Sequence, residues 1–157
     1  MHPLFESDMV WRLIAAAVLG AILGFERSLS GKHAGMRTYA LVAMGSALFT
    51  VVGTVAAQQM SVFVGINPLQ IASSVVVGIG FIGAGLSVMR GEGSHAELTT
   101  ATGIWVAAAV GMTVGFGFYS TAVAATILGI LIFSLLARLE HRLRTRFGSR
   151  YTETNGG

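Results

Sequence analysis

The sequence predicts an all-α integral membrane protein, a bundle of about five transmembrane helices. The first observation is composition: of 157 residues, 54% are hydrophobic and only 11% are charged, whereas soluble domains carry about 25% charged residues. The second is that the apolar residues gather in five stretches, each close to the roughly 20 residues that cross a bilayer. A soluble fold would lack the polar surface to cover such a chain.

The five predicted spans follow one another with short connections. They run over residues 9–25, 39–58, 71–89, 100–118 and 119–137. Pro68 suits a turn into the third span, and only the stretch around Gly115–Tyr119 separates the last two, which predicts a tight helical hairpin. Residues 1–140 therefore form a transmembrane domain, and residues 141–157 form a basic cytoplasmic tail.

The positive charges predict the orientation, because loops rich in Lys and Arg stay in the cytoplasm. Nine of the ten basic residues fall on one side of a five-span chain: Arg27, Lys32, Arg37, Arg90, Arg138, Arg142, Arg144, Arg146 and Arg150. The tenth, Arg12, lies just inside the first span and can extend outward. The N-terminus is thus expected outside and the C-terminus inside. Since the basic residues serve topology, no nucleic-acid partner is expected.

A polar site is expected at the cytoplasmic mouth, where the first span ends and the second begins. Its members there are Glu26, Arg27, Lys32, Arg37 and Thr38. An acid at this depth is costly unless it is paired. Glu26 therefore either pairs with Arg37 or Lys32, or contributes to a cation or lipid-headgroup site.

The fourth span opens with Glu97, Thr99 and Thr100, which complete this polar set. The threonine hydroxyls, including that of Thr102, suit helix capping, or alternatively bonds back to helix carbonyls. Glu97 could join Glu26 as an oxygen ligand for magnesium. The spacing does not establish such a site, so the metal stays unassigned.

Glycines mark several helix faces. Stripes of small residues, which let helices approach closely in a membrane, include Gly20 with Gly24, Gly80 with Ala84, and the run Gly103, Gly111 and Gly115. These are expected to be packing seams, within one subunit or between two. The third span also carries Gly78, Gly80, Gly83 and Gly85, and four glycines so close together could alternatively bend that helix or expose carbonyls to a permeating ion.

Nothing in the sequence indicates catalysis. There is no cysteine, the only aspartate is Asp8, and all four histidines lie outside the predicted spans, so no serine–histidine or paired-aspartate arrangement can form in the membrane. The glycines from Gly78 to Gly85 match the dinucleotide-binding pattern, but they lie inside an apolar span rather than after a strand. We therefore expect neither an enzyme nor a cofactor.

Four blocks of the chain resemble the MgtC/SapB family of bacterial inner-membrane proteins: Gly24–Arg27, Ala34–Thr38, Gly78–Gly85, and Leu98–Ala101 with Trp105. The chain departs from the family pattern at Tyr39, where a histidine is usual, and at Gln70 and Ser74, where arginine and glutamine are usual. Longer members continue into a cytoplasmic domain resembling ACT modules, so the chain resembles the membrane domain alone.

The resemblance implies a role in adaptation to magnesium limitation and, in pathogens, in survival inside host cells. Family members are discussed as magnesium transporters and as modulators of other membrane machinery, ATP synthase included. The leading hypothesis is a non-enzymatic protein of ion homeostasis that acts through helix contacts, as a homodimer joined through the face of Gly111 and Gly115 or with a membrane partner. The alternative is a transporter or channel for magnesium or another cation, with its path along span three.

Overall fold

The structure is a computed structural model that describes residues 3–60, 67–88, 95–139 and 142–143. It consists of five long helices: α1 (Pro3–Leu29), α2 (Met36–Met60), α3 (Pro68–Val88), α4 (His95–Gly115) and α5 (Tyr119–Leu131). The last continues directly into a π-helical segment, η1 (Ile132–Leu136). The first four helices, and the helical run Tyr119–Leu139 that contains α5 and η1, are long and apolar enough to cross a membrane, which confirms the prediction of an all-α membrane protein.

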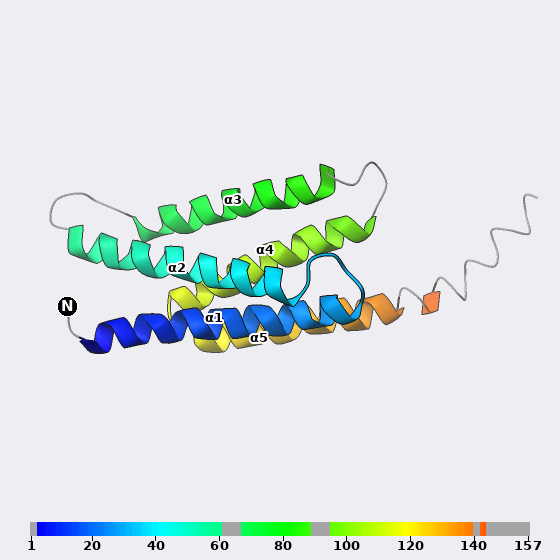
Figure 1. The fold of residues 1–157 in the computed structure, drawn as a ribbon, viewed down its shortest axis with the longest axis horizontal. Coiled ribbons are helices and arrows are strands. Elements are labelled where there is room, and N and C mark those ends of the chain that lie inside the picture. Colours follow the sequence, from blue (N-terminus) through cyan, green and yellow to red (C-terminus); the bar gives the residue numbers. More distant parts are fainter. Residues whose placement is uncertain (1–2, 61–66, 89–94, 140–141, 144–157) are drawn as a thin grey trace, which may run out of the picture.

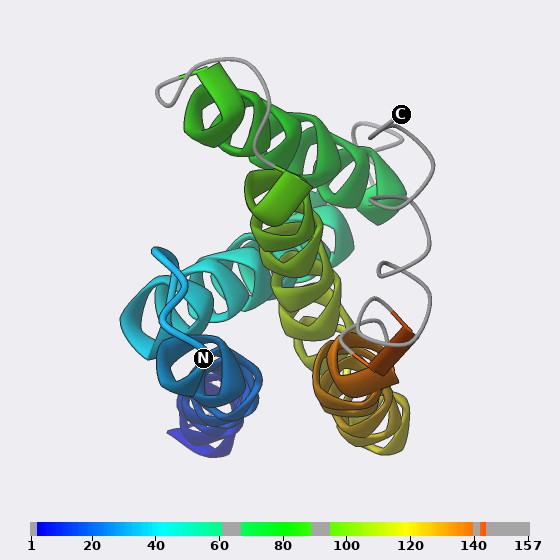
Figure 2. The same ribbon diagram turned by 90° about the vertical axis from the view of Figure 1, so that its right-hand side faces the viewer.

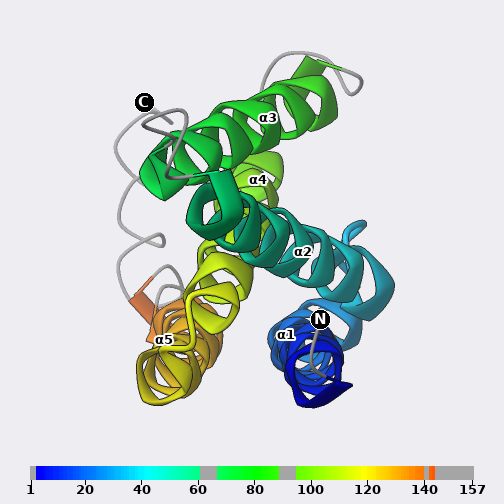
Figure 3. The ribbon, with the colours of Figure 1, turned by 90° about the vertical axis from the view of Figure 1, so that its left-hand side faces the viewer.

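The helices lie in three layers. α3 forms one outer layer, α2 and α4 form the middle layer, and α1 and α5 form the other outer layer (Figures 1, 2 and 3). Within the described residues α3 contacts only α2 and α4, whereas α4 contacts every other helix. The central helix is therefore α4, and α3 is the least enclosed.

Small residues allow the middle layer to pack closely. One buried cluster contains Ala16, Ala47, Val110, Val114 and Ala122. A second, toward the other end of the bundle, contains Leu23, Tyr39, Ile104, Ala107 and Phe133 among others. Because much of this core is alanine, the helix backbones lie close together, as is usual for membrane helices.

The helices are longer than the predicted spans at most ends, because hydrogen bonding continues past the last apolar residue. The fourth span, predicted to reach residue 118, is shorter at its end, because α4 ends at Gly115. The chain turns at Gly117, whose φ of +89° is accessible to glycine at no steric cost, and α5 begins at Tyr119. The predicted tight hairpin is present. Arg90 and most of the predicted tail, residues 141–157, fall outside the described residues.

Arg12 fastens α1 to this hairpin. Its Nη2 lies 2.7 Å from Asp8 Oδ2, and its Nη1 donates a hydrogen bond of 2.9 Å to the Gly115 carbonyl. The guanidinium thus satisfies one of the carbonyls left open at the end of α4. Arg12 thereby makes a tertiary contact that the sequence did not predict.

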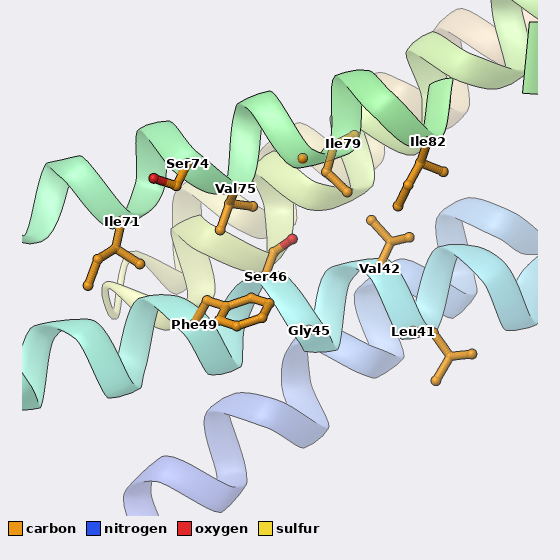
Figure 4. A pocket seen from close by; sticks show the side chains of 11 residues that line it. Leu41, Val42, Gly45, Ser46, Phe49, Ile71, Ser74, Val75, Ile79 and Ile82 are labelled. Atoms are coloured by element: carbon orange, nitrogen blue, oxygen red, sulfur yellow. The ribbon is translucent and has the colours of Figure 1, made fainter. Parts of the chain in front are cut away.

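An apolar groove of about 540 Å³ separates α2 from α3. From α3, the side chains of Ile71, Val75, Ile79 and Ile82 point toward α2, where Val42 and Phe49 lie opposite (Figure 4). Of the lining residues, only Ser46 and Ser74 have polar side chains.

Candidate functional site

A buried arginine is the centre of the candidate site. Arg27, at the end of α1, is only 4% exposed. The close approach of α1 to α2 places it there: a Cβ on Gly24 would lie 2.8 Å from both Met36 Cα and Tyr39 Cβ. Only glycine permits this spacing, so the Gly20–Gly24 stripe is a packing seam within the chain.

Four helices contribute to the surroundings of Arg27. Its Nη2 donates to Thr100 Oγ1 on α4 at 3.2 Å, and its guanidinium carbon lies 4.6 Å from the centroid of the Phe133 ring in η1. The Tyr39 hydroxyl on α2 lies beside the guanidinium and donates to the Thr100 carbonyl at 3.4 Å. The site therefore ties α1, α2, α4 and the end of α5 together.

The charge of Arg27 is not neutralised by a carboxylate in the described residues, where the one recorded ion pair is Arg12 with Asp8. Its Nε atom is buried and has no partner in that part of the chain. A cation–π contact contributes about 2 kcal/mol when desolvated, and a hydrogen bond to a charged group about 1.5–3 kcal/mol, whereas burying a charge costs several. Such a group in a membrane protein is a functional candidate.

Glu26 does not make the pair expected of it. Its Oε1 accepts a hydrogen bond of 2.8 Å from Ser30 Oγ, and its Oε2 is buried without a partner in the described chain. Among the described residues the structure records no ion pair between Glu26 and either Arg37 or Lys32. Glu26 therefore contributes a second unsatisfied polar atom at the same end of the bundle.

The threonines of α4 do not cap the helix. Because α4 begins at His95, Thr99, Thr100 and Thr102 lie beyond its first turn, where capping is not available, so that expectation was wrong. Thr102 Oγ1 donates to the Leu98 and Thr99 carbonyls at 3.1 and 2.9 Å, the alternative bond back to the helix. Thr100 Oγ1 accepts a hydrogen bond from Arg27.

The other predicted members lie around this centre. Arg37 is exposed in the first turn of α2, Thr38 is half-buried beside it, and Lys32 is half-buried in the loop between α1 and α2. The side chain of Glu97 lies outside the described residues. No three His, Cys, Asp or Glu side chains of the described chain gather as a metal site would require.

Sequence reasoning missed three members of the site: Tyr39, Phe133 and Ser28. Tyr39 had been singled out only as a departure from the family pattern, and Phe133 is one apolar residue among many in its helix. Ser28 Oγ donates to the Gly24 carbonyl at 3.2 Å and accepts the Met36 N–H at 3.0 Å. It thereby fixes the loop between α1 and α2, a role that a serine near a helix end could have signalled.

The glycines of α4 pack inside the chain. A Cβ on Gly111 would clash with the Ala43 backbone, one on Gly115 would lie 2.7 Å from Thr50 Cβ, and one on Gly103 would meet the Phe133 ring. The face of Gly111 and Gly115 is thus occupied by α2. A contact between two copies must use another surface than the one expected.

The glycines of α3 are different. A Cβ on Gly78, Gly80 or Gly85 would meet nothing within 4 Å, and one on Gly83 would make an ordinary 3.5 Å contact with Ala101. Despite these glycines α3 is an uninterrupted helix, so its carbonyls are used in helical hydrogen bonds rather than exposed to an ion.

Comparison with known proteins places the chain among bacterial relatives. The MgtC family profile matches residues 13–142. The chain is 39% identical over 153 residues to "Putative magnesium transporter YhiD" of Escherichia coli strain K12, covering 96% of this chain and 71% of that protein. It is 40% identical over 153 residues to Protein SrpB of Synechococcus elongatus, covering 89% and 84%. Protein MgtC of Brucella abortus strain 2308 is 37% identical over 139 residues, covering 83% and 56%. No solved structure matches the chain.

Proposed function

The chain belongs to the MgtC family, and on that premise we propose that it is a non-enzymatic protein of magnesium homeostasis that acts through helix contacts in the membrane. It is a multi-pass protein of the bacterial inner membrane. The magnesium part of the proposal is supported by the name of the YhiD relative. The mode of action is supported by the outward face of α3.

That face is the observation that carries the proposal. Val77 and Phe81 are 72% and 81% exposed, and they flank Gly80 and Ala84, which are exposed too. Only 6% of the α3 span is buried, against 50% of the α4 span. These four residues form the outward face of α3, and its small-residue stripe, Gly80 with Ala84, is left open by the fold.

In lipid, a stripe of small residues favours contact with another helix. Apolar side chains gain little from leaving lipid tails, so membrane helices associate through close packing at small residues and through weak backbone contacts. Gly80 and Ala84 are four residues apart and share one side of α3. A second copy of the chain, or a helix of a partner protein, would pack there, with Val77 and Phe81 at the sides.

Cross-linking tests the self-contact directly, because the chain has no cysteine of its own. Ala84→Cys in native membranes should give a disulfide-linked dimer upon mild oxidation, and Val123→Cys, on the exposed side of α5, should not. Adding Gly80→Leu should abolish the Ala84→Cys dimer, and adding Gly78→Leu, on the groove side of α3, should not. Equal cross-linking at both positions would refute a specific contact.

Ion flux separates this proposal from transport. Liposomes that contain the purified protein should move magnesium no faster than empty liposomes. Flux that Glu26→Gln or Arg37→Ala abolishes would replace the proposal by a transporter with its path at the Arg27 end.

A further inference from the structure

A groove lined by apolar side chains lies between α2 and α3. We propose that the groove holds an acyl chain of an anionic phospholipid whose phosphate binds Arg37. This inference does not depend on the proposed function, because it concerns the groove side of α3 and not the outward face.

The lining of the groove fits a hydrocarbon chain. Its walls are apolar apart from two serines, and the hydroxyl of Ser74 donates to the Gln70 carbonyl of its own helix at 3.0 Å. A polar ligand would find few groups to bind. Gly45 and Gly78 stand on the two walls, and a Cβ on either would meet nothing within 4 Å, so the space between the helices stays open.

The size of the groove suits an extended acyl chain. Its α2 wall runs from Leu41 to Phe49, about 12 Å at 1.5 Å per residue. A helix is about 10–12 Å in diameter with its side chains. An extended acyl chain is much thinner and is present at high concentration around every membrane span.

Charge at one end of the groove selects the headgroup. Arg37 lies one helical turn before Leu41 and is exposed, and in the described part of the chain no hydrogen bond or ion pair of Arg37 is recorded. It is the second residue of α2, so it lies where the span meets the membrane surface and where the helix dipole also favours an anion. Basic groups beside grooves between membrane helices bind anionic lipid headgroups in this way.

Native mass spectrometry of the purified full chain in detergent tests the proposal, with phosphatidylglycerol and phosphatidylcholine that carry the same oleoyl chains as probes. Phosphatidylglycerol should bind the wild type more tightly by about fivefold, the effect of one arginine near a membrane surface. Arg37→Gln should remove that preference, and Arg138→Gln, an exposed arginine away from the groove, should keep it.

Filling the groove should weaken the binding of both phospholipids. A leucine at Gly78 or Gly45 would enter the open space, so Gly78→Leu and Gly45→Leu should each lower the affinity for both phospholipids, while Gly80→Leu, on the outward face, should not. Far-UV circular dichroism checks that each variant is folded. Gly78→Leu fills the groove from α3 and Gly45→Leu fills it from α2, so if one variant does not fold, the other still tests the proposal. Unchanged lipid affinity in the folded filling variants, or a kept preference in Arg37→Gln, would overturn the proposal. Loss of a dimer rather than of lipid in Gly78→Leu would assign the groove to a second copy.

Discussion

Gly111→Ala should weaken the contact between α4 and α2 measurably. The added Cβ would lie 2.7 Å from the carbonyl carbon and 2.8 Å from the Cα of Ala43, where ordinary contact begins at 3.4 Å. Both are backbone atoms, so no side chain can rotate away and the two helices must separate. Overpacking of this kind costs about 1–3 kcal/mol.

Gly45→Ala is the matched control, because its Cβ would meet nothing within 4 Å. Both changes replace a helical glycine by alanine, which favours the helix by up to about 1 kcal/mol. The difference in unfolding free energy between the two variants therefore reports the overpacking alone, and should be about 1–3 kcal/mol.

Unfolding in mixed micelles with increasing SDS, followed by far-UV circular dichroism, measures this difference. Equal unfolding free energies for the two variants would refute the reasoning, because they would mean that α2 and α4 are not held in contact at Gly111.

Two further stability predictions concern buried and half-buried charges. Arg27→Met should unfold no more easily than the wild type in the same assay, because the lost hydrogen bond and cation–π contact, together about 3.5–5 kcal/mol, are offset by removal of a buried charge that costs several kcal/mol. Arg27→Lys keeps the charge but loses the planar group over Phe133, so it should be less stable than Arg27→Met, and equal stability of the two variants would contradict this account. Asp8→Asn should lower the free energy of unfolding by less than about 1 kcal/mol, because the ion pair of Asp8 with Arg12 is exposed. Arg12→Leu should lower it by about 1–3 kcal/mol, because the Gly115 carbonyl is left unsatisfied. Equal losses in the two variants would show that the hydrogen bond from Arg12 to Gly115 contributes nothing.

The spans could be predicted because hydropathy depends only on residue type and length. The composition of the candidate site could be predicted in part, since Arg27 and Thr100 stand out as polar residues at helix ends. Their pairing could not, because the rotation of each helix about its axis decides which side chains meet, and uniformly apolar helices carry little periodic signal of that rotation. Tyr39 and Phe133 were missed for this reason.

The glycines also show that the sequence does not tell which neighbour a helix face contacts. Sequence identified Gly80 and Gly111 as equivalent members of small-residue stripes, but the first faces outward and the second touches α2. Spacing along one helix tells which residues share a face. It does not tell which helix, or which molecule, covers that face.

The π-helical segment η1 changes the directions in which the residues after it point from the last helix. Each residue of an α-helix advances about 100° around the axis, and a π turn accommodates one residue more than an α turn. Before Ile132, Gly129 lies against Leu23. After Leu136, the directions of Arg138 and Leu139 are rotated by about one residue relative to those in an uninterrupted α-helix. Deletion of a single residue within 134–136 would leave a regular α-helix with the ring of Phe133 and the charge of Arg138 in their present directions, whereas an α-helix of unchanged length would rotate Arg138 by about 100° relative to Gly129.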